Sequence, residues 1–269
     1  MTRSTLFIAA LAASWFSATA TSAHAQAQEE DKPPPTFSAK NWPLALVDRP
    51  LVLAPFMAEF RGDLFRVEMS RDRVGDPVTM APALFVGINK RVTVGVFHDI
   101  GICVSGNDCD DGTYRTYNDL GFEALTSVLY GGVLEIAGRA GLTFNPLSPF
   151  TTGIYMGVRA HMGGGSFALF LDPSVYVGLV GRDRKAEYVD VPIQLQFQLS
   201  DQNAAFLRTG VRGAMRDIGE NAEVPVGIGG LFALGRRLDV GAEFLFNNLL
   251  GTGGNISSRV MFVRLAIRI

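Results

Sequence analysis

Arginines that recur four residues apart are the side chains of this sequence best suited to act on charged molecules. Arg208 and Arg212 have this spacing, and so do Arg264 and Arg268. Because successive side chains of a β-strand point to opposite faces, both members of each pair would lie on one face. Arginine rows that face carboxylates across a water-filled space create a transverse field that sorts polar solutes by charge. The alternative is that the charges form ion pairs that brace a narrow interior, because an unpaired buried charge is costly. We call such ion pairs struts.

The residues expected on this polar face carry charges of both signs. On the two-residue alternation we assign ten pore-lining candidates, which are Glu135, Arg139, Arg159, Asp172, Asp190, Arg208, Arg212, Glu243, Arg264 and Arg268. Uncharged polar residues on the same face indicate a hydrated interior, namely Tyr155, Tyr176, Gln194, Gln196 and Gln198. Struts are favoured over a charge filter for the ten candidates, and both interpretations stay open.

Patterns that would indicate an enzyme or a metal site are weak. His98 and Asp99 are adjacent, so on a strand they would face opposite sides and could not form a catalytic pair. The acidic stretch 107–112 lacks the spacing of an EF-hand loop, because Cys109 occupies a ligand position and no glutamate closes the loop. We therefore predict no catalytic residues, no metal site and no cofactor. An enzyme stays a less favoured alternative, because members of a catalytic triad need not be close in sequence.

The C-terminal residues show the kind of element that would hold these charges. Between Val263 and Ile269 apolar aliphatic residues occupy every second position, and Arg264 and Arg268 lie between them. A strand with this pattern has one aliphatic face and one basic face, which is typical of a membrane barrel with a wet interior. Comparable segments predict twelve strands, at residues 50–60, 78–88, 91–101, 121–130, 133–144, 152–162, 166–179, 187–199, 204–214, 223–234, 238–247 and 258–269.

The predicted strands are joined by connections of two alternating lengths. Short, turn-like connections occur at 88–91, 130–133, 162–166, 200–203 and 235–237. Longer links lie between them, at 61–77, 102–120, 145–151, 180–186, 215–222 and 248–257. Outer-membrane barrels separate short periplasmic turns from long external loops in this way. The alternation predicts an even number of strands, with both ends of the barrel domain on the side of the short turns.

The first 49 residues differ in composition from the rest. Arg3 precedes a short apolar stretch, and Ala23 and Ala25 provide the small residues of a cleavage site, so we predict a secretory signal peptide at residues 1–25. Residues 26–49 begin polar and contain three consecutive prolines, which predicts a flexible periplasmic segment. The remaining residues, 50–269, would form a single transmembrane domain.

Composition restricts the class of protein further. Apolar residues make up 48% of the chain, but after residue 25 no uninterrupted stretch supplies the roughly 20 apolar residues that a spanning helix needs. A closed barrel is the structure that satisfies its backbone hydrogen bonds in lipid without helices. Removal of the signal peptide would leave 23 of the 24 basic residues against 26 acidic ones. No basic stripe is available for phosphates, so nucleic acid is excluded as a partner.

The two cysteines of the chain, Cys103 and Cys109, are six residues apart. An even count at close spacing in an exported protein favours a disulfide over a metal site. We therefore predict a Cys103–Cys109 disulfide within the external loop 102–120.

On these patterns the chain resembles a bacterial outer-membrane β-barrel of the small porin or channel type. The resemblance covers residues 50–269 and rests on alternation and loop lengths rather than on a specific motif. Barrels of this type commonly end in an aromatic residue, whereas this chain ends in Ile269, with Phe262 nearby. The resemblance implies a location in the outer membrane of a Gram-negative bacterium, with membrane lipid and the barrel-assembly machinery as partners.

The sequence therefore predicts an all-β fold, an antiparallel transmembrane β-barrel of about 12 strands, with 8, 10 or 14 as alternatives. We expect a passive channel for small polar solutes, with a non-conducting structural or surface-interaction barrel as the rival and an outer-membrane enzyme as a weaker one. Inward glycines would leave room for a channel, because each lacks a side chain. These are Gly87, Gly95, Gly157, Gly178, Gly227, Gly229 and Gly241.

Overall fold

The computed structural model describes residues 37–98, 101–106, 109, 119–147, 150–182 and 187–269. The predicted signal peptide at 1–25, and the start of the predicted periplasmic segment, lie outside the described residues. The described part forms a closed antiparallel barrel of twelve strand positions with two extra strands, so the predicted fold class is confirmed. No described helix is long and apolar enough to cross a membrane.

Strand bounds follow the alternation predicted from the sequence at most positions. The strands are β1 Ala58–Glu68, β2 Val78–Gly87, β3 Val92–Phe97, β4 Ile102–Ser105, β5 Leu120–Gly131, β6 Leu134–Phe144, β7 Thr152–Gly164, β8 Phe167–Leu171, β9 Ser174–Val180, β10 Tyr188–Gln198, β11 Asn203–Ala214, β12 Val226–Leu234, β13 Leu238–Phe246 and β14 Arg259–Arg268. The described residues also form two short helices, η1 Leu46–Asp48 and α2 Ile218–Asn221.

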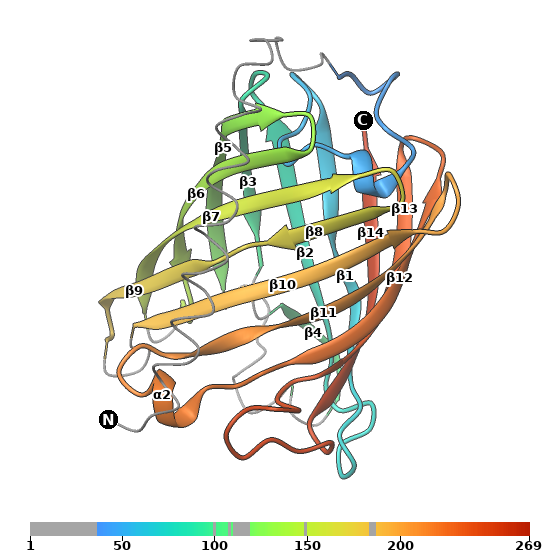
Figure 1. Ribbon diagram of the computed structural model, residues 1–269. Coiled ribbons are helices and arrows are strands. Elements are labelled where there is room, and N and C mark those ends of the chain that lie inside the picture. The colour runs from blue at the N-terminus through green and yellow to red at the C-terminus, as the bar shows by residue number, and fades with distance from the viewer. Residues whose placement is uncertain (1–36, 99–100, 107–108, 110–118, 148–149, 183–186) are drawn as a thin grey trace. The chain divides into compact units, whose positions relative to one another are not determined.

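The barrel closes where the first strand pairs with the last. β1 and β14 are antiparallel, with Glu59 opposite Arg268 and Phe60 opposite Ile267, and Figure 1 shows the two strands side by side. Ala58 and Ile269 exchange backbone hydrogen bonds of 3.1 and 2.9 Å at the end of this ladder. Closure leaves no unpaired edge along this seam, which is the condition for placing a sheet in lipid.

The two lengths of connection are separated as predicted. Connections at 88–91, 132–133, 165–166, 199–202 and 235–237 define what we call the short-turn end of the barrel. Connections at 69–77, 98–119, 145–151, 181–187, 215–225 and 247–258 define the long-loop end. Both Ala58 and Ile269, the two ends of the barrel wall, lie at the short-turn end.

The first strand departs from its predicted position. The sequence predicts it at 50–60, whereas β1 is Ala58–Glu68. A turn precedes β1, in which the Met57 N–H donates to the Ala54 carbonyl at 3.0 Å. Pro55 favours this turn because its ring fixes φ near the value required at the second turn position. The apolar residues before the turn therefore do not belong to the barrel wall.

One predicted strand is divided into two, and another is followed by an extra strand that lies in a predicted loop. The segment predicted at 166–179 is interrupted at Asp172 and Pro173, and both halves, β8 and β9, pair with β7 and β10 at successive positions. The strand predicted at 91–101 ends early, at Phe97 in β3, and β4 lies in the predicted loop 102–120. This extra strand pairs with β2 beyond the residues that pair with β3. The extra strands therefore continue positions in the wall, and the count of twelve positions stands.

The outward face of the wall is apolar and exposed, which is the reverse of a water-soluble protein. Ile228 is 60% exposed, and many other apolar side chains of the outward face are more than a third exposed. Among them are Phe60, Leu84, Val94, Val96, Phe122, Leu142, Met156, Val158, Leu207, Val211 and Phe232. Contiguous apolar surface of this kind is suited to a membrane.

The predicted disulfide is confirmed. Cys103, in β4, is bonded to Cys109, with 5.7 Å between their Cα atoms. It lies at the long-loop end. Most of the acidic stretch 107–112 lies outside the described residues.

Leu207 tests whether the outward face contacts lipid. It lies near the middle of β11 and is 47% exposed, so Leu207→Arg is expected to destabilise the barrel in lipid by about 2–4 kcal/mol. Met215→Arg is the matched control, because Met215 has a similar exposure of 44% but follows β11 in a long connection. Folding into vesicles across a urea series measures both variants. Equal midpoints for the two would contradict the lipid-facing assignment.

Candidate functional site

All ten candidate residues lie on the inward face of the barrel wall. The register shows this, because residues directly opposite each other in paired strands share a face. Asp190 lies opposite Arg212, and Glu135 lies opposite His161. The same relation, followed around the ring, assigns nine of the candidates to the face that carries the buried polar side chains. The tenth, Asp172, lies between β8 and β9, and its ion pairs with Arg139 and Arg159 place it on the same face. Pore lining by these residues stays a prediction.

The first charged cluster joins four neighbouring positions of the wall, β5, β6, β7 and the position of β8 and β9. Arg139 forms an ion pair with Glu123 at 2.5 Å and with Asp172 at 3.0 Å. Arg159 reaches the other oxygen of Asp172 at 2.7 Å. Tyr155 donates its hydroxyl to Glu123 at 2.8 Å, and the Arg139 guanidinium lies 4.9 Å from the centre of the Tyr155 ring. Each carboxylate here is shared between donors from different strands.

A second cluster lies on the opposite stretch of the wall and centres on Glu243. The side chain of Glu243 is fully buried and forms ion pairs with Arg264 and, at 3.4 Å, with Arg208. Arg264 also approaches Asp63 at 3.4 Å. Arg66 holds the other oxygen of Asp63 at 3.0 Å. The pairs therefore link β11, β13, β14 and β1 across the interior face.

The third cluster lies nearer the short-turn end, across the seam where the barrel closes. Arg268 forms ion pairs of 2.6 Å with both Glu59 and Asp239. Glu59 also pairs with Arg61 at 3.2 Å. Arg49, which precedes the barrel wall, donates from Nη2 to Asp239 at 3.0 Å. Arg268 and its two carboxylates are all buried.

Of the remaining candidates, Asp190 lies opposite Arg212 in the register, and Glu135 and Arg212 have partners outside the three clusters. Glu135 is buried and accepts a hydrogen bond of 2.8 Å from the Leu51 N–H. It therefore binds the chain that precedes β1, and it does not form an ion pair with an arginine of the described wall. Arg212 pairs with Glu223 at 2.7 Å, close to the long-loop end. The structure therefore brings most of the ten candidates into mutual contact, as the strut interpretation expects.

Several interior charges were not selected from the sequence. They are Arg49, Glu59, Arg61, Asp63, Arg66, Glu123 and Asp239. Arg61, Asp63 and Arg66 were missed because the first strand was predicted too early, so that they fell in the predicted loop 61–77. Within β1 the alternation Glu59, Arg61, Asp63 on one face is regular and would have been a usable signal.

The inward glycines do not leave the space expected of them. A side chain at Gly95 would collide with the Phe85 ring at 2.2 Å, and one at Gly229 would collide with the Phe206 ring at 2.3 Å. At Gly227 the nearest atom is in Leu245, at 2.8 Å. Bulky side chains of neighbouring strands thus lie over these glycines. The expectation of room at these positions is wrong, because the space beside each glycine is filled by a side chain of a neighbouring strand.

Open space is found instead between the charged clusters. One cavity of about 570 Å³ is lined by arginines of all three clusters together with Phe85, Phe97 and His98. A second, of about 350 Å³, is lined by Arg61, Arg159 and Arg208 and by a single carboxylate, Asp172. Gln194 and Gln196 complete its polar lining. The interior is therefore partly filled by struts and partly hollow.

A histidine–aspartate contact exists that the sequence did not indicate. His98 Nδ1 lies 3.1 Å from Asp119 Oδ1, while Asp99 lies outside the described residues. The described lining of the cavity beside His98 includes no Ser, Thr or Cys that could act as a nucleophile. Nor does any group of three or more His, Cys, Asp or Glu side chains in the described part have the geometry to hold a metal ion.

Comparison with known proteins identifies the fold. No family model matches the chain, and no curated protein sequence matches it. Among solved structures the chain is similar to the KdgM porin, with a TM-score of 0.53 and 7% identity, over 78% of this chain and 98% of that one. It is similar to the NanC porin with a TM-score of 0.51 and 7% identity over the same shares. The chain thus has the fold of an outer-membrane, porin-type barrel.

Glu243→Gln tests whether the interior charges act as struts. The change keeps the size of the side chain but removes the charge on which Arg208 and Arg264 converge. Loss of one partner from a fully buried pair costs about 3–5 kcal/mol. Because the two arginine side chains are 31% and 27% exposed, we expect a loss nearer about 2–3 kcal/mol. Urea unfolding in detergent or lipid vesicles measures it.

The control and the double variant make this test specific. Glu187→Gln removes an ion pair with Arg182, which is 60% exposed, and should leave the unfolding midpoint unchanged. Glu243→Gln/Arg264→Gln should recover part of the lost stability, since only one of the two arginines, Arg208, is then left without its carboxylate. An unfolding midpoint of Glu243→Gln equal to that of the unmodified protein would show that the pairs are not struts.

Proposed function

We propose that this protein is an outer-membrane channel that passes small polar solutes passively and favours anions modestly. The observation that carries the proposal is the hollow interior, whose largest described cavities have more arginines than carboxylates in their lining. An exported barrel with an apolar outer surface meets lipid on one side and water on the other. Membrane lipid and the barrel-assembly machinery are its proposed partners, and the signal peptide at 1–25 its proposed route of export.

The preference for anions follows from the balance of charge within the cavities. In the smaller cavity four arginine side chains (Arg49, Arg61, Arg159 and Arg208) face one carboxylate, Asp172. A guanidinium has five N–H donors, and Arg208 reaches its partner Glu243 at 3.4 Å, the long end of hydrogen-bond range. A passing anion could therefore exchange hydration for these donors. The carboxylates nearby keep the preference modest.

The rival function is a non-conducting barrel with a structural or surface-interaction role. The three ion-pair clusters favour it, because they bridge neighbouring strands and occupy much of the interior. The KdgM porin has also been solved in complex with disordered oligogalacturonate, at 8% identity to this chain and a TM-score of 0.51. That complex supports a solute as the partner of a barrel with this fold, and so the channel over its rival. An enzyme is the least supported of the three.

Charge reversal at two interior arginines tests the channel and its selectivity together. In planar bilayers the unmodified protein should conduct with a weak preference for anions. Arg208→Glu/Arg264→Glu should reverse that preference, because each arginine lies in a described interior cluster and faces the permeating ion. Heat-modifiable gel mobility identifies folded protein, and Arg208→Gln/Arg264→Gln serves as a milder variant if the reversal does not fold.

A matched surface variant completes the experiment. Arg71→Glu changes the same charge in an exposed long connection and should leave the reversal potential unchanged. No conductance from correctly folded, unmodified protein would end the channel proposal. Conductance with the same selectivity in the double variant would keep the channel and remove these arginines from its path.

A further inference from the structure

The chain that leads into the barrel wall lies within the barrel. We call residues 42–57 the inner segment. Figure 1 shows η1, which belongs to it, at the end of the barrel where the chain terminates. Trp42, Leu46, Leu51 and Leu53 all line interior cavities, although the sequence analysis expected residues up to 49 to be a flexible lead-in.

The sequence explains why this segment binds the wall through its backbone. Pro43, Pro50 and Pro55 interrupt it, and each proline removes an N–H and restricts helix formation. Apart from the three residues of η1, the segment therefore has little regular structure of its own. Buried backbone N–H groups still require acceptors. Inward-facing side chains of the barrel supply them.

Four strands spaced around the ring hold the segment. Gln198 Oε1, in β10, accepts from the Leu46 and Val47 N–H groups at 2.9 and 3.2 Å. Glu135, in β6, accepts from the Leu51 N–H at 2.8 Å, and Thr93, in β3, accepts from the Leu53 N–H at 2.8 Å. Asp239, in β13, pairs with the Arg49 side chain.

These contacts come from widely separated points of the circumference. In ring order the four strands are two to four positions apart, so the segment spans the bore rather than following one side of it. Arg236, in the turn between β12 and β13, adds a hydrogen bond to the Trp42 carbonyl. The inner segment is thus bonded to the wall at many points around the ring and crosses the bore. We call this arrangement the crossbar.

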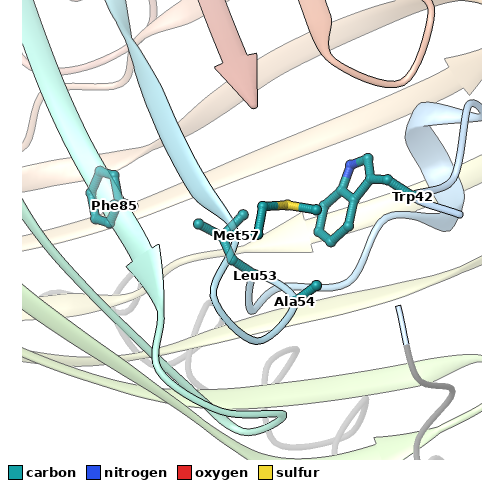
Figure 2. Packing of buried hydrophobic residues seen from close by; sticks show 5 residues of the cluster. All are labelled: Trp42, Leu53, Ala54, Met57 and Phe85. Carbon is teal, nitrogen blue, oxygen red and sulfur yellow. The ribbon is translucent and has the colours of Figure 1, made fainter. Parts of the chain in front are cut away.

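A buried apolar cluster fixes the end of the segment next to β1. It consists of Trp42, Leu53, Ala54, Met57 and Phe85, and Figure 2 shows the Met57 side chain extending toward the Trp42 indole. Ala54 approaches the wall so closely that a side chain at Gly87 would lie 2.1 Å from its carbonyl oxygen. The inner segment therefore packs directly against Gly87. This position is not open space in the lumen.

The interior cavities meet at the middle of the inner segment. Arg49 and Pro50 line both cavities described above, and they also line a third of about 220 Å³. The third cavity lies at the short-turn end, beside the turn between β5 and β6. The segment therefore separates the short-turn mouth from the larger cavities beyond it.

We propose that the inner segment is the constriction of the lumen and that Arg49 is its selectivity-determining residue. A solute that crosses the barrel has to pass between Arg49–Pro50 and the wall. The width there sets the size limit, and the guanidinium of Arg49 sets the sign of charge that passes. This inference rests on the proposed channel function and assigns its narrowest point.

Removal of residues 42–52, the larger part of the inner segment, tests the constriction directly. A variant lacking residues 37–52 retains the turn before β1 and every strand of the wall, so we expect single-channel conductance to rise by about twofold or more. A control lacking residues 26–36 removes a similar piece of chain ahead of the segment and should conduct as the unmodified protein does. Heat-modifiable mobility shows that each is folded.

A second pair of variants keeps the chain at full length. Arg49→Ala/Glu135→Ala removes the contacts of the inner segment with two of the four strands, β13 and β6. It should raise conductance and weaken the anion preference. Its matched control is Arg182→Ala/Glu187→Ala, an ion pair in a long connection. Amide hydrogen exchange of residues 46–53 gives a readout that needs no conduction. Exchange there should be slow in the unmodified protein and faster by about tenfold or more in the first variant.

The outcomes separate this inference from the channel proposal. A silent unmodified protein with a conducting 37–52 deletion would end the channel proposal but would show that the inner segment closes the lumen. Equal conductance of the two would overturn the constriction and leave the channel in place. Silence of both folded forms would overturn the channel and the constriction together. Rapid exchange of residues 46–53 in the unmodified protein would overturn the crossbar whatever the conductance.

Discussion

The pairing of β1 with β14 is the constraint on which the rest of the structure depends. Lipid offers no hydrogen-bond partners, so the sheet has to close on itself before its apolar face can be exposed. Closure assigns one face of every strand to the outside and the other to the interior. Glu59 and Arg268, opposite each other across the seam, then become the centre of a buried charged cluster.

The interior combines two roles that the sequence presented as alternatives. Ion pairs such as Arg139 with Glu123 bridge neighbouring strands and supply partners for charges that would otherwise be costly. The clusters are nevertheless separated by cavities, because each pair lies along the wall instead of reaching across the bore. Struts and open space therefore coexist. Because each carboxylate is shared between several donors, arginines outnumber carboxylates in the lining of the cavities.

Local pattern was sufficient for most of the wall. Two-residue alternation and the spacing of turns predicted the closed antiparallel fold, the twelve positions, the side of the short turns and the Cys103–Cys109 disulfide. These properties depend on residues close in sequence, which is why they could be predicted. The first strand was the exception. Residues 50–57 are as apolar as a strand, and a turn that contains Pro55 ends that stretch before β1 begins.

By itself, then, the sequence determined for most strands which face points inward, and that this face carries charges of both signs. Tertiary structure alone decided which arginine meets which carboxylate, because the partners come from strands far apart in the chain and depend on register and closure. It also decided that Phe85 and Phe206 fill the space beside inward glycines. The same holds for the inner segment. Its position in the bore depends on Thr93, Glu135, Gln198 and Asp239 converging from separate strands, which no local pattern specifies.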